Sequence, residues 1–326
     1  MERRDLLILG SAVVTWPFTA RAQLSGGRSL ITWLAGATEW NASKYIGFLK
    51  EGLQELGYAE GRNFDFGARY ADGYVERLPA LAEELARLKP AVIVAGAVDA
   101  AVAARKVTTT IPIVSAALAD AVHLGLVASY AHPGSNVTGI TPYVEGLPAK
   151  QLELAREVVP GATKIGLLGN MNDPKAPPQR QELEGAAGTL GVKVVVPEVR
   201  TPEDLAGAIQ ALASERVDVV IILQTTMMIS ERRQIGPLLA AARLPTVYGY
   251  REHVDDGGLI SYGVDLRWCW HHVATYVQKI LNGAAPGDLP VEFPTKLEMV
   301  VNLNAAKALG LTIPPLILAN ADELIE

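Results

Sequence analysis

The chain has 326 residues, with 35 acidic and 29 basic side chains, and a formal net charge of −6. This mildly acidic balance argues against nucleic acid and anionic membrane surfaces as partners, because both need clustered basic residues. The length predicts two lobes, each able to bury its own core. The single cysteine, Cys269, excludes an internal disulfide and makes a cysteine-based metal site implausible.

The first 22 residues have the layout of a bacterial export signal. Arg3 and Arg4 precede a short apolar run over 6–18, and the small-residue stretch 20–22 follows. The run is too short to span a bilayer, which needs about 20 apolar residues. We therefore expect cleavage between Ala22 and Gln23 and a soluble periplasmic protein. The alternative is a first strand or helix of the folded domain, and the choice between Sec and twin-arginine export stays open.

The first half of the mature chain alternates short apolar runs with helical patterns. Ile46, Leu49 and Leu53 recur at helical spacing before Gly57, a probable C-terminal cap by its residue type. In chain order we predict a strand at 30–35, a helix ending at 56, a strand at 63–70, a helix within 75–90, a strand at 91–96, a helix at 99–107 and a strand at 111–116.

The same rhythm returns after residue 145 and gives way to a less regular tail. Asp265 can cap a helix with a buried stripe that includes Cys269 and Trp270. In chain order we predict a helix at 148–158, a strand at 164–170, a helix at 178–190, a strand at 192–199, a helix at 203–214, a strand at 217–224, a helix at 230–242, strands at 244–250 and 258–263, a helix at 266–282, a strand at 296–303, and short helices at 304–311 and 315–326.

Strands that alternate with helices predict parallel sheets with helices on both faces. The near-continuous apolar strands fit this α/β class, because both faces of such a sheet are covered. The two blocks predict two similar doubly wound lobes, completed by the late elements. The chain then crosses between the lobes more than once, which makes a hinge with a cleft where a small ligand can bind.

The sequence lacks the common catalytic and metal-binding patterns. It has no phosphate-binding loop, no dinucleotide-binding glycine motif and no nucleophile elbow. The adjacent His271 and His272 point in different directions on a helix, so they cannot share a metal. Cys269 lies on an apolar stripe and is expected to be buried and inert. We expect no enzyme activity, no catalytic residue, no metal and no cofactor.

The loops that follow the strands carry small residues, hydroxyls, amides and tyrosines. In open α/β sheets ligands bind at the carboxyl ends of the strands, and the helix starts there offer free N–H groups to a carboxylate. Tyrosines and Trp40 offer flat apolar walls. This profile is typical of a pocket for a small organic acid or amino acid, although many of these residues are also ordinary turn formers.

Long motifs in the chain strongly resemble a family of bacterial ABC-importer substrate-binding proteins. They are "LVASYAHPGSNVTGIT" at 126–141, the stretch 288–326, "LQELGYAEGRNFDFGARYADG" at 53–73 and "GGLISYGVD" at 257–265. The resemblance implies the type I periplasmic-binding fold, with two α/β lobes, three crossovers and a cleft that closes by hinge motion. It also implies a small-molecule ligand and delivery to ABC permease subunits in the inner membrane, with better understood members linked to aromatic or branched amino acids.

On this fold, lobe 1 would comprise residues 28–140 plus 265–284, and lobe 2 would comprise 141–264 plus 285–326. Residues 136–142 would be a crossover. The expected ligand-binding residues are a hydroxyl donor (Thr38), backbone donors (Ala97 and Val98), an acceptor (Asp120), aromatic walls (Tyr143, Tyr250 and Tyr262) and second-lobe hydrogen-bonding groups (Asn170 and Gln224).

Two departures from the family pattern affect the expected ligand. The family usually has Gly-Asp-Pro where this chain has Ala119-Asp120-Ala121. In the second lobe it often has an aspartate after the last apolar strand residues, where the loop of this chain is Gln224-Thr225-Thr226. A missing carboxylate weakens recognition of an ammonium group, so an amino acid and a carboxylic acid without an amine stay equally open. A ligand-binding sensor for a signalling receptor and an exported α/β enzyme are the alternative functions. We expect a monomer.

Overall fold

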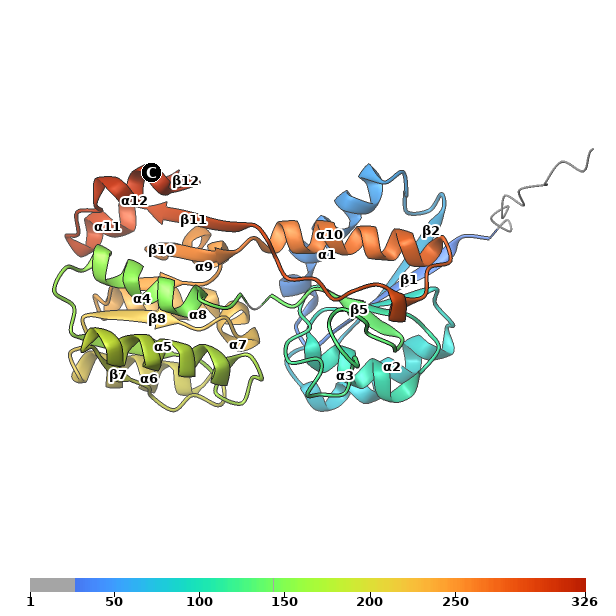
Figure 1. The fold of residues 1–326 in the computed structure, drawn as a ribbon, viewed down its shortest axis with the longest axis horizontal. Coiled ribbons are helices and arrows are strands. Elements are labelled where there is room, and N and C mark those ends of the chain that lie inside the picture. Colours follow the sequence, from blue (N-terminus) through green and yellow to red (C-terminus); the bar gives the residue numbers. More distant parts are fainter. Residues whose placement is uncertain (1–26, 143) are drawn as a thin grey trace, which may run out of the picture.

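The computed structural model describes residues 27–142 and 144–326, so the predicted export signal and Tyr143 lie outside the described residues. The described chain forms two α/β lobes side by side, joined by three crossing segments (Figure 1). This confirms the predicted fold class. Within the described ranges, no helix is long and apolar enough to cross a membrane.

Lobe 1 contains a five-stranded parallel sheet with the order β2-β1-β3-β4-β5. Helices α1 and α10 cover one face of this sheet, and α2 and α3 cover the other. The elements of the lobe are β1 (Ser29–Ala35), α1 (Glu39–Glu55), β2 (Phe64–Tyr70), η1 (Val75–Arg77), α2 (Leu78–Arg87), β3 (Val92–Ala95), α3 (Val98–Val107), β4 (Ile113–Ser115), β5 (Val137–Gly139), α10 (Leu266–Leu281) and η2 (Pro286–Asp288).

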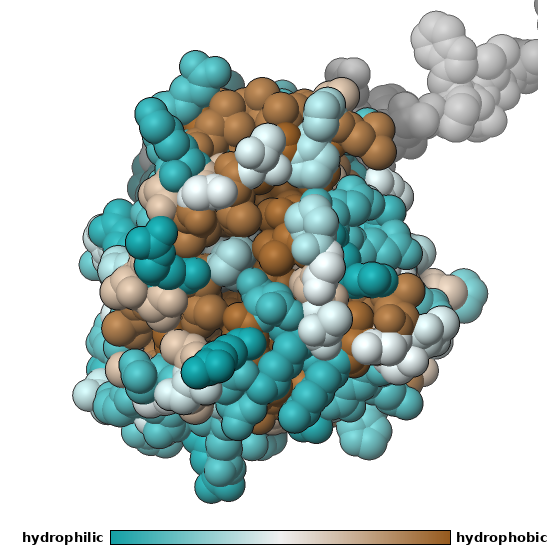
Figure 2. All heavy atoms as spheres, turned by 90° about the vertical axis from the view of Figure 1, so that its left-hand side faces the viewer, coloured by the Kyte–Doolittle hydropathy of each residue, from teal (hydrophilic) through white to brown (hydrophobic). Residues whose placement is uncertain are grey.

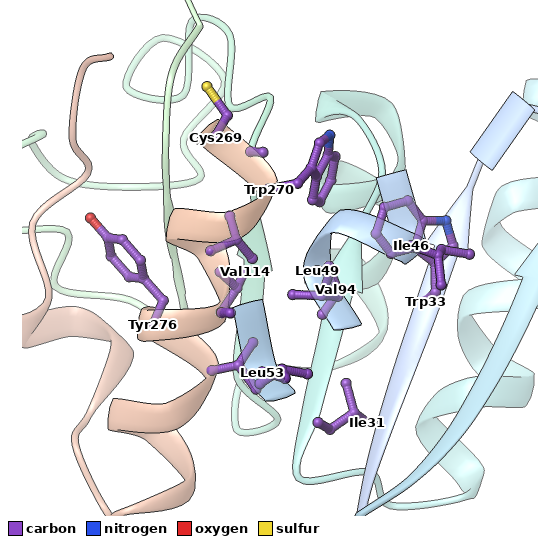
Figure 3. Close-up of a cluster of buried hydrophobic side chains, with 14 of the residues drawn as sticks. Ile31, Trp33, Ile46, Leu49, Leu53, Val94, Val114, Cys269, Trp270 and Tyr276 are labelled. Carbon is purple, nitrogen blue, oxygen red and sulfur yellow. The ribbon is translucent and has the colours of Figure 1, made fainter. Parts of the chain in front are cut away.

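Residues of β1 alternate between the two cores of lobe 1, as the two-residue period of a strand requires. Trp33 packs with α1 and α10, whereas Leu34 packs with α2 and α3. Figure 3 shows Trp33 and Trp270 among the side chains that join β1, α1 and α10, and their ring centroids lie 4.7 Å apart. Gly52 lets α1 approach α10, because a β-carbon there would lie 2.9 Å from the Ala274 β-carbon.

Lobe 2 contains a seven-stranded sheet with the order β12-β11-β10-β9-β8-β6-β7, parallel except for the antiparallel pair β10–β11. Helices α4, α5, α11 and α12 cover one face, and α6, α7, α8 and α9 cover the other. The elements are α4 (Leu147–Val158), β6 (Lys164–Leu168), α5 (Ala176–Leu190), β7 (Lys193–Val195), α6 (Asp204–Ser214), β8 (Val219–Ile222), α7 (Thr226–Ser230), α8 (Arg232–Ala241), β9 (Thr246–Tyr248), α9 (Arg251–Asp255), β10 (Ile260–Val264), β11 (Leu297–Asn302), α11 (Leu303–Leu309), α12 (Pro315–Asn320) and β12 (Glu323–Ile325).

The C-terminal elements close the end of lobe 2 that faces away from lobe 1. Figure 2 shows this end, where apolar surface is interrupted by polar side chains. The sequence predicts one helix over 315–326, but the chain forms α12 and then β12, which pairs in parallel with β11. The prediction of one helix is therefore wrong in its last part, because pairing with a strand distant in sequence outweighs the local helical pattern.

The three segments that cross between the lobes are linked to one another at the hinge by a hydrogen bond and an ion pair. Thr141 N donates to Glu292 O at 3.0 Å, so the first and third segments run side by side. Lys296 of the third segment lies 3.1 Å from the carboxylate of Asp265 in the second. Residues 285–292, which the sequence assigns to lobe 2, run along lobe 1, where Thr138 donates to Leu289 O at 2.6 Å. The third crossing therefore follows Glu292.

Candidate ligand-binding cleft

The carboxyl ends of the parallel strands in the two lobes face each other across a cleft. On the lobe 1 side, Asp99 lies in the first turn of α3, directly after β3. Burial raises the pKa of Asp99, while a hydrogen bond from Ala100 N and the nearby charge of Lys175 in lobe 2 oppose that increase. Asp99 approaches the backbone of Gly36 so closely that a β-carbon there would lie 2.9 Å from its Oδ2. A residue other than glycine at position 36 would displace this carboxylate.

On the lobe 2 side, a buried lysine lies near Asp99. The side chains of Lys175 and Asp173, in the segment between β6 and α5, are only 8% and 9% exposed. Asp173 accepts hydrogen bonds from the backbone N–H groups of Lys175 and Thr226, at 3.0 and 2.8 Å. The Lys175 ammonium is held less closely, at 3.4 Å from the Thr226 hydroxyl and 3.8 Å from Asp173 Oδ2. A buried ammonium with contacts this long retains capacity to bind an anion.

Tyr250 brings an aromatic ring from lobe 2 into the interface. It follows β9, is only 4% exposed and packs in the same core cluster as Trp33 and Trp270 of lobe 1. Burial raises its pKa, and the negative charge of Asp173 adds to the increase. Its phenol therefore stays neutral and joins the two lobes through apolar contact.

The outer edge of the cleft is closed by contacts between α1 and the helices α8 and α9. The Lys44 ammonium lies 3.6 Å from Glu252 Oε1 and 3.4 Å from Asp255 Oδ2. The Trp40 ring lies against Arg233, whose guanidinium carbon is 4.0 Å from the ring centroid. Each of these contacts joins the two lobes, so the structure describes the lobes closed on each other.

Several sequence-predicted residues lie at the strand ends of lobe 1. Thr38 is the N-cap of α1, and its hydroxyl accepts from Asn41 N at 3.3 Å. Ala97 and Val98 form the start of α3, which has no side-chain cap at Ala97. Asp120 lies apart from these residues, exposed in a turn with φ of 51°. Burial raises the pKa of the Tyr130 phenol, and the nearby charge of Asp120 adds to the increase.

The predicted residues Gln224, Asn170 and Tyr262 make hydrogen bonds within lobe 2. Gln224 lies at the end of β8, with its amide donating to Gly249 O at 2.9 Å, so that amide is engaged within the lobe. Asn170 follows β6; its Oδ1 accepts from Asn172 N at 2.9 Å. Tyr262 packs against the core of lobe 2 and contributes its backbone carbonyl to a 2.8 Å hydrogen bond from Gln151.

The sequence analysis does not single out Asp99, Lys175 or Glu252. Their positions after predicted strands are a usable signal, because Lys175 lies two residues after "LLGNMND" and Glu252 lies two residues after Tyr250. Their burial is not readable from sequence, because charged residues near a turn are usually solvent-exposed. Only the packing of one lobe on the other reveals it.

The remaining reactive side chains, those of Cys269, His271 and His272, are buried or paired with a carboxylate. Cys269 is fully buried against the lobe 1 core, and burial raises the pKa of its thiol, which confirms the prediction of a buried cysteine. His272 Nε2 lies 2.7 Å from Glu292, whereas His271 Nδ1 lies 3.5 Å from Glu55. Among residues 27–142 and 144–326, no group of three or more His, Cys, Asp or Glu side chains could hold a metal ion.

Two α/β lobes, three crossing segments and a cleft between strand ends define a solute-binding protein of the periplasmic-binding type. The profile of the ABC transporter substrate binding protein family matches residues 41–325. The chain therefore belongs to this family, whose members are solute-binding proteins rather than enzymes, as the sequence analysis predicts.

Individual relatives agree with this assignment. The chain is 27% identical over 265 residues to a tyrosine-binding protein of Clostridioides difficile, a match that covers 81% of this chain and 76% of the relative. A conserved domain protein from Vibrio cholerae has a TM-score of 0.85 at 29% identity, over 91% of this chain and 100% of that one. An ABC domain from Streptococcus pneumoniae, solved in complex with L-Trp, has a TM-score of 0.84 at 23% identity, over 92% and 100%.

Proposed function

We propose that this chain is the exported solute-binding component of an ABC importer. In this function the cleft captures a small organic solute that carries a carboxylate. The solute is either an amino acid or an aromatic or branched carboxylic acid. Closure of the hinge around the solute produces the form that is delivered to permease subunits in the inner membrane. The single observation that carries the proposal is the buried ammonium of Lys175 in the wall of the cleft.

The surroundings of Lys175 suit a carboxylate. Among the described residues of lobe 2 its ammonium has contacts of 3.4 and 3.8 Å, and it lies near the Asp99 carboxyl of lobe 1. An incoming carboxylate would gain a shorter, charge-assisted hydrogen bond. The uncapped N–H groups at Ala97 and Val98, in lobe 1, would approach the same anion from the other side. A solute held by both lobes binds the closed form better than the open form and shifts the population toward closure.

Other groups at the strand ends would contact the rest of the solute. Thr225 is fully buried, and its hydroxyl has no hydrogen-bond partner among the described residues. The neutral ring of Tyr250 offers an apolar wall, and the Thr38 hydroxyl lies at the start of α1. Two similar proteins are described with tyrosine and L-Trp as ligands, which supports an aromatic amino acid as the first class of solute to test.

The test is a thermal-shift screen of residues 23–326, unfolded and refolded to remove carried-over ligand, against amino acids, aromatic acids and branched acids. At about 100 times the dissociation constant, a true ligand stabilises the protein by about 2.7 kcal/mol.

The Lys175→Met variant should weaken binding of a carboxylate about 10-fold to 150-fold, the effect of losing a charge-assisted hydrogen bond. Lys150→Met is the matched control, because Lys150 of lobe 2 is 54% exposed. Unchanged affinity in Lys175→Met would contradict the proposal.

Delivery and export need measurements in cells. Uptake of the identified solute should fall when the gene is deleted and return with the wild-type gene but not with Lys175→Met. The sensor alternative predicts unchanged uptake and a lost transcriptional or chemotactic response. Mass spectrometry of the periplasmic protein should find Gln23 at its N-terminus, and a chain that retains residues 1–22 in the cytoplasm would contradict export.

A further inference from the structure

A cavity of about 240 Å³ lies at the outer edge of the cleft, beside the closing contacts. One of its walls is the N-terminal half of α1 in lobe 1, and the other is formed by α8 and α9 in lobe 2. The side chains that line it include Trp40, Asn41, Lys44, Tyr45, Arg232 and Glu252. Because both lobes contribute walls, the cavity exists in this form only while the lobes are closed.

Buried acceptor atoms of Glu252 and Asn41 line this cavity and receive neither a hydrogen bond nor a close ion pair from the described residues. Glu252 is 2% exposed, and its Oε2 has no hydrogen-bond partner within the described parts of the chain. Asn41 Oδ1 is likewise buried and without a donor there. Leaving a buried acceptor unpaired costs about 1–3 kcal/mol, and more when the group is charged. The two atoms belong to opposite lobes, so one donor group between them would satisfy both and join the lobes.

The neighbouring charges are already engaged with one another. Asp255 lies 3.4 Å from Lys44 and 3.3 Å from Arg251, and Asp256 lies 2.8 Å from Arg232. Glu252 is held less closely: Lys44 lies 3.6 Å from its other oxygen, Oε1. Burial raises the pKa of Glu252, and the charge of Lys44 and a hydrogen bond from its own backbone N–H oppose that increase. Within the cavity, Glu252 is therefore the carboxylate with capacity left for another cation.

We propose that this cavity is a subsite for a cationic nitrogen group of the solute, a primary ammonium or a guanidinium, which donates to Glu252 Oε2 and Asn41 Oδ1. Both groups carry the several N–H donors that two acceptors require. The aromatic ring of Tyr45, which also lines the cavity, favours a cation in this position. The inference rests on the proposed function and narrows it, because a solute that also carries a carboxylate for Lys175 would be a zwitterion.

The carboxylate for the cationic group comes from Glu252 of α9. Gln224 cannot supply it, since its amide is neutral and donates to Gly249 O within lobe 2. The carboxylate therefore reaches the cleft from α9 instead of from the end of β8.

The test uses three probes built on one phenyl ring: phenethylammonium, 3-phenylpropionate and L-phenylalanine. Their affinities are measured by isothermal titration calorimetry with the wild-type mature chain, Glu252→Gln and Asn41→Ala. Glu298→Gln is the matched control, since Glu298 is also a buried glutamate of lobe 2 but does not line the cavity. Glu252→Gln keeps the shape of the side chain, and circular dichroism checks that each variant is folded.

We expect phenethylammonium to bind the wild type and Glu298→Gln at millimolar concentration, and to bind Glu252→Gln at least about tenfold more weakly. Asn41→Ala should weaken the same probe less, while 3-phenylpropionate should be indifferent to both substitutions and sensitive to Lys175→Met. No binding of phenethylammonium to the wild type, or equal binding to Glu252→Gln, would overturn the subsite. Failure of every carboxylate probe with intact binding of phenethylammonium would overturn the proposed acid site and leave the cation subsite standing.

Discussion

The indole ring of Trp40 in lobe 1 stacks against the guanidinium group of Arg233 in lobe 2, with 4.0 Å between the ring centroid and Cζ. Arg232 lies on the same ring at 5.5 Å. Trp40 is 52% exposed, so packing in a hydrophobic core does not explain the position of its ring. The contact exists only when the lobes are closed, which makes it part of the free-energy difference between the open and closed forms.

Removing this contact should weaken ligand binding through closure. A cation–π contact at an exposed site contributes about 0.5–1 kcal/mol, so Trp40→Ala should raise the dissociation constant roughly twofold to fivefold. The radius of gyration from small-angle X-ray scattering should increase in the ligand-free protein. Tyr74→Ala is the control, because Tyr74 is an exposed aromatic residue of the same lobe at 59% exposure. Unchanged affinity and an unchanged radius would show that Trp40 has no part in closure.

His253 should make the protein less stable as the pH falls. The side chain is 3% exposed, and burial lowers its pKa to about 4 from the usual 6.5. The unfolded chain therefore takes up a proton before the folded chain does, and stability is lost as the pH falls from about 6.5 to about 4, by roughly 3 kcal/mol in total. Urea unfolding of His253→Asn should have a flatter pH dependence in this window. His123→Asn, at an exposed position, should keep the wild-type slope.

Glu298 should contribute a pH dependence of the opposite sign. Burial, with the negative charges of Asp265 and Glu252, raises its pKa to about 7 despite the opposing effect of Arg251. Because the folded chain holds this proton more tightly than the unfolded chain, the stabilisation is complete below about 4.5 and is lost as the pH rises to about 7. Glu298→Gln should therefore increase the slope of stability with pH between 4.5 and 7. A smaller slope in this variant would contradict the assignment.

Gly139 at the end of β5 should not tolerate a side chain. Its φ is +141°, and a β-carbon there would lie 1.9 Å from the backbone oxygen of Ser115 in β4. Gly139→Ala should destabilise the protein by at least about 2 kcal/mol. Gly188→Ala is a control with the opposite expected sign, because Gly188 lies within α5 with open space around its Cα. It should stabilise by up to about 1 kcal/mol, measured by the same urea titration.

Cys269 should react with a thiol reagent only after unfolding. Its side chain is fully buried, and burial raises the pKa of the thiol, so both access and thiolate are suppressed in the folded protein. Labelling with iodoacetamide should be complete in concentrated urea and should be very slow in buffer. Rapid labelling of the folded chain would mean that α10 separates readily from the sheet.

The periodic pattern of apolar residues was sufficient to predict most of the elements. Ile46, Leu49 and Leu53 recur on one face of α1, and all three are buried against β1 and α10. The short elements were harder to predict, because three residues carry no usable period. Val137–Gly139 lies in the predicted crossover 136–142, yet it forms β5 by pairing with β4. The predicted helix at 230–242 is confirmed as α8, whereas the five-residue α7 was not predicted.

By itself, the sequence determined the two-lobed α/β architecture, the buried position of Cys269 and the loops from which a binding site is built, because apolar periodicity and turn residues act locally. Only the tertiary structure decided that Lys175 and Glu252 are buried, that Gln224 is engaged within its own lobe and that Asp120 is exposed. The physical reason is that the burial of a charged side chain depends on which distant segments pack around it. In this chain those segments belong to two lobes that meet only when the cleft closes.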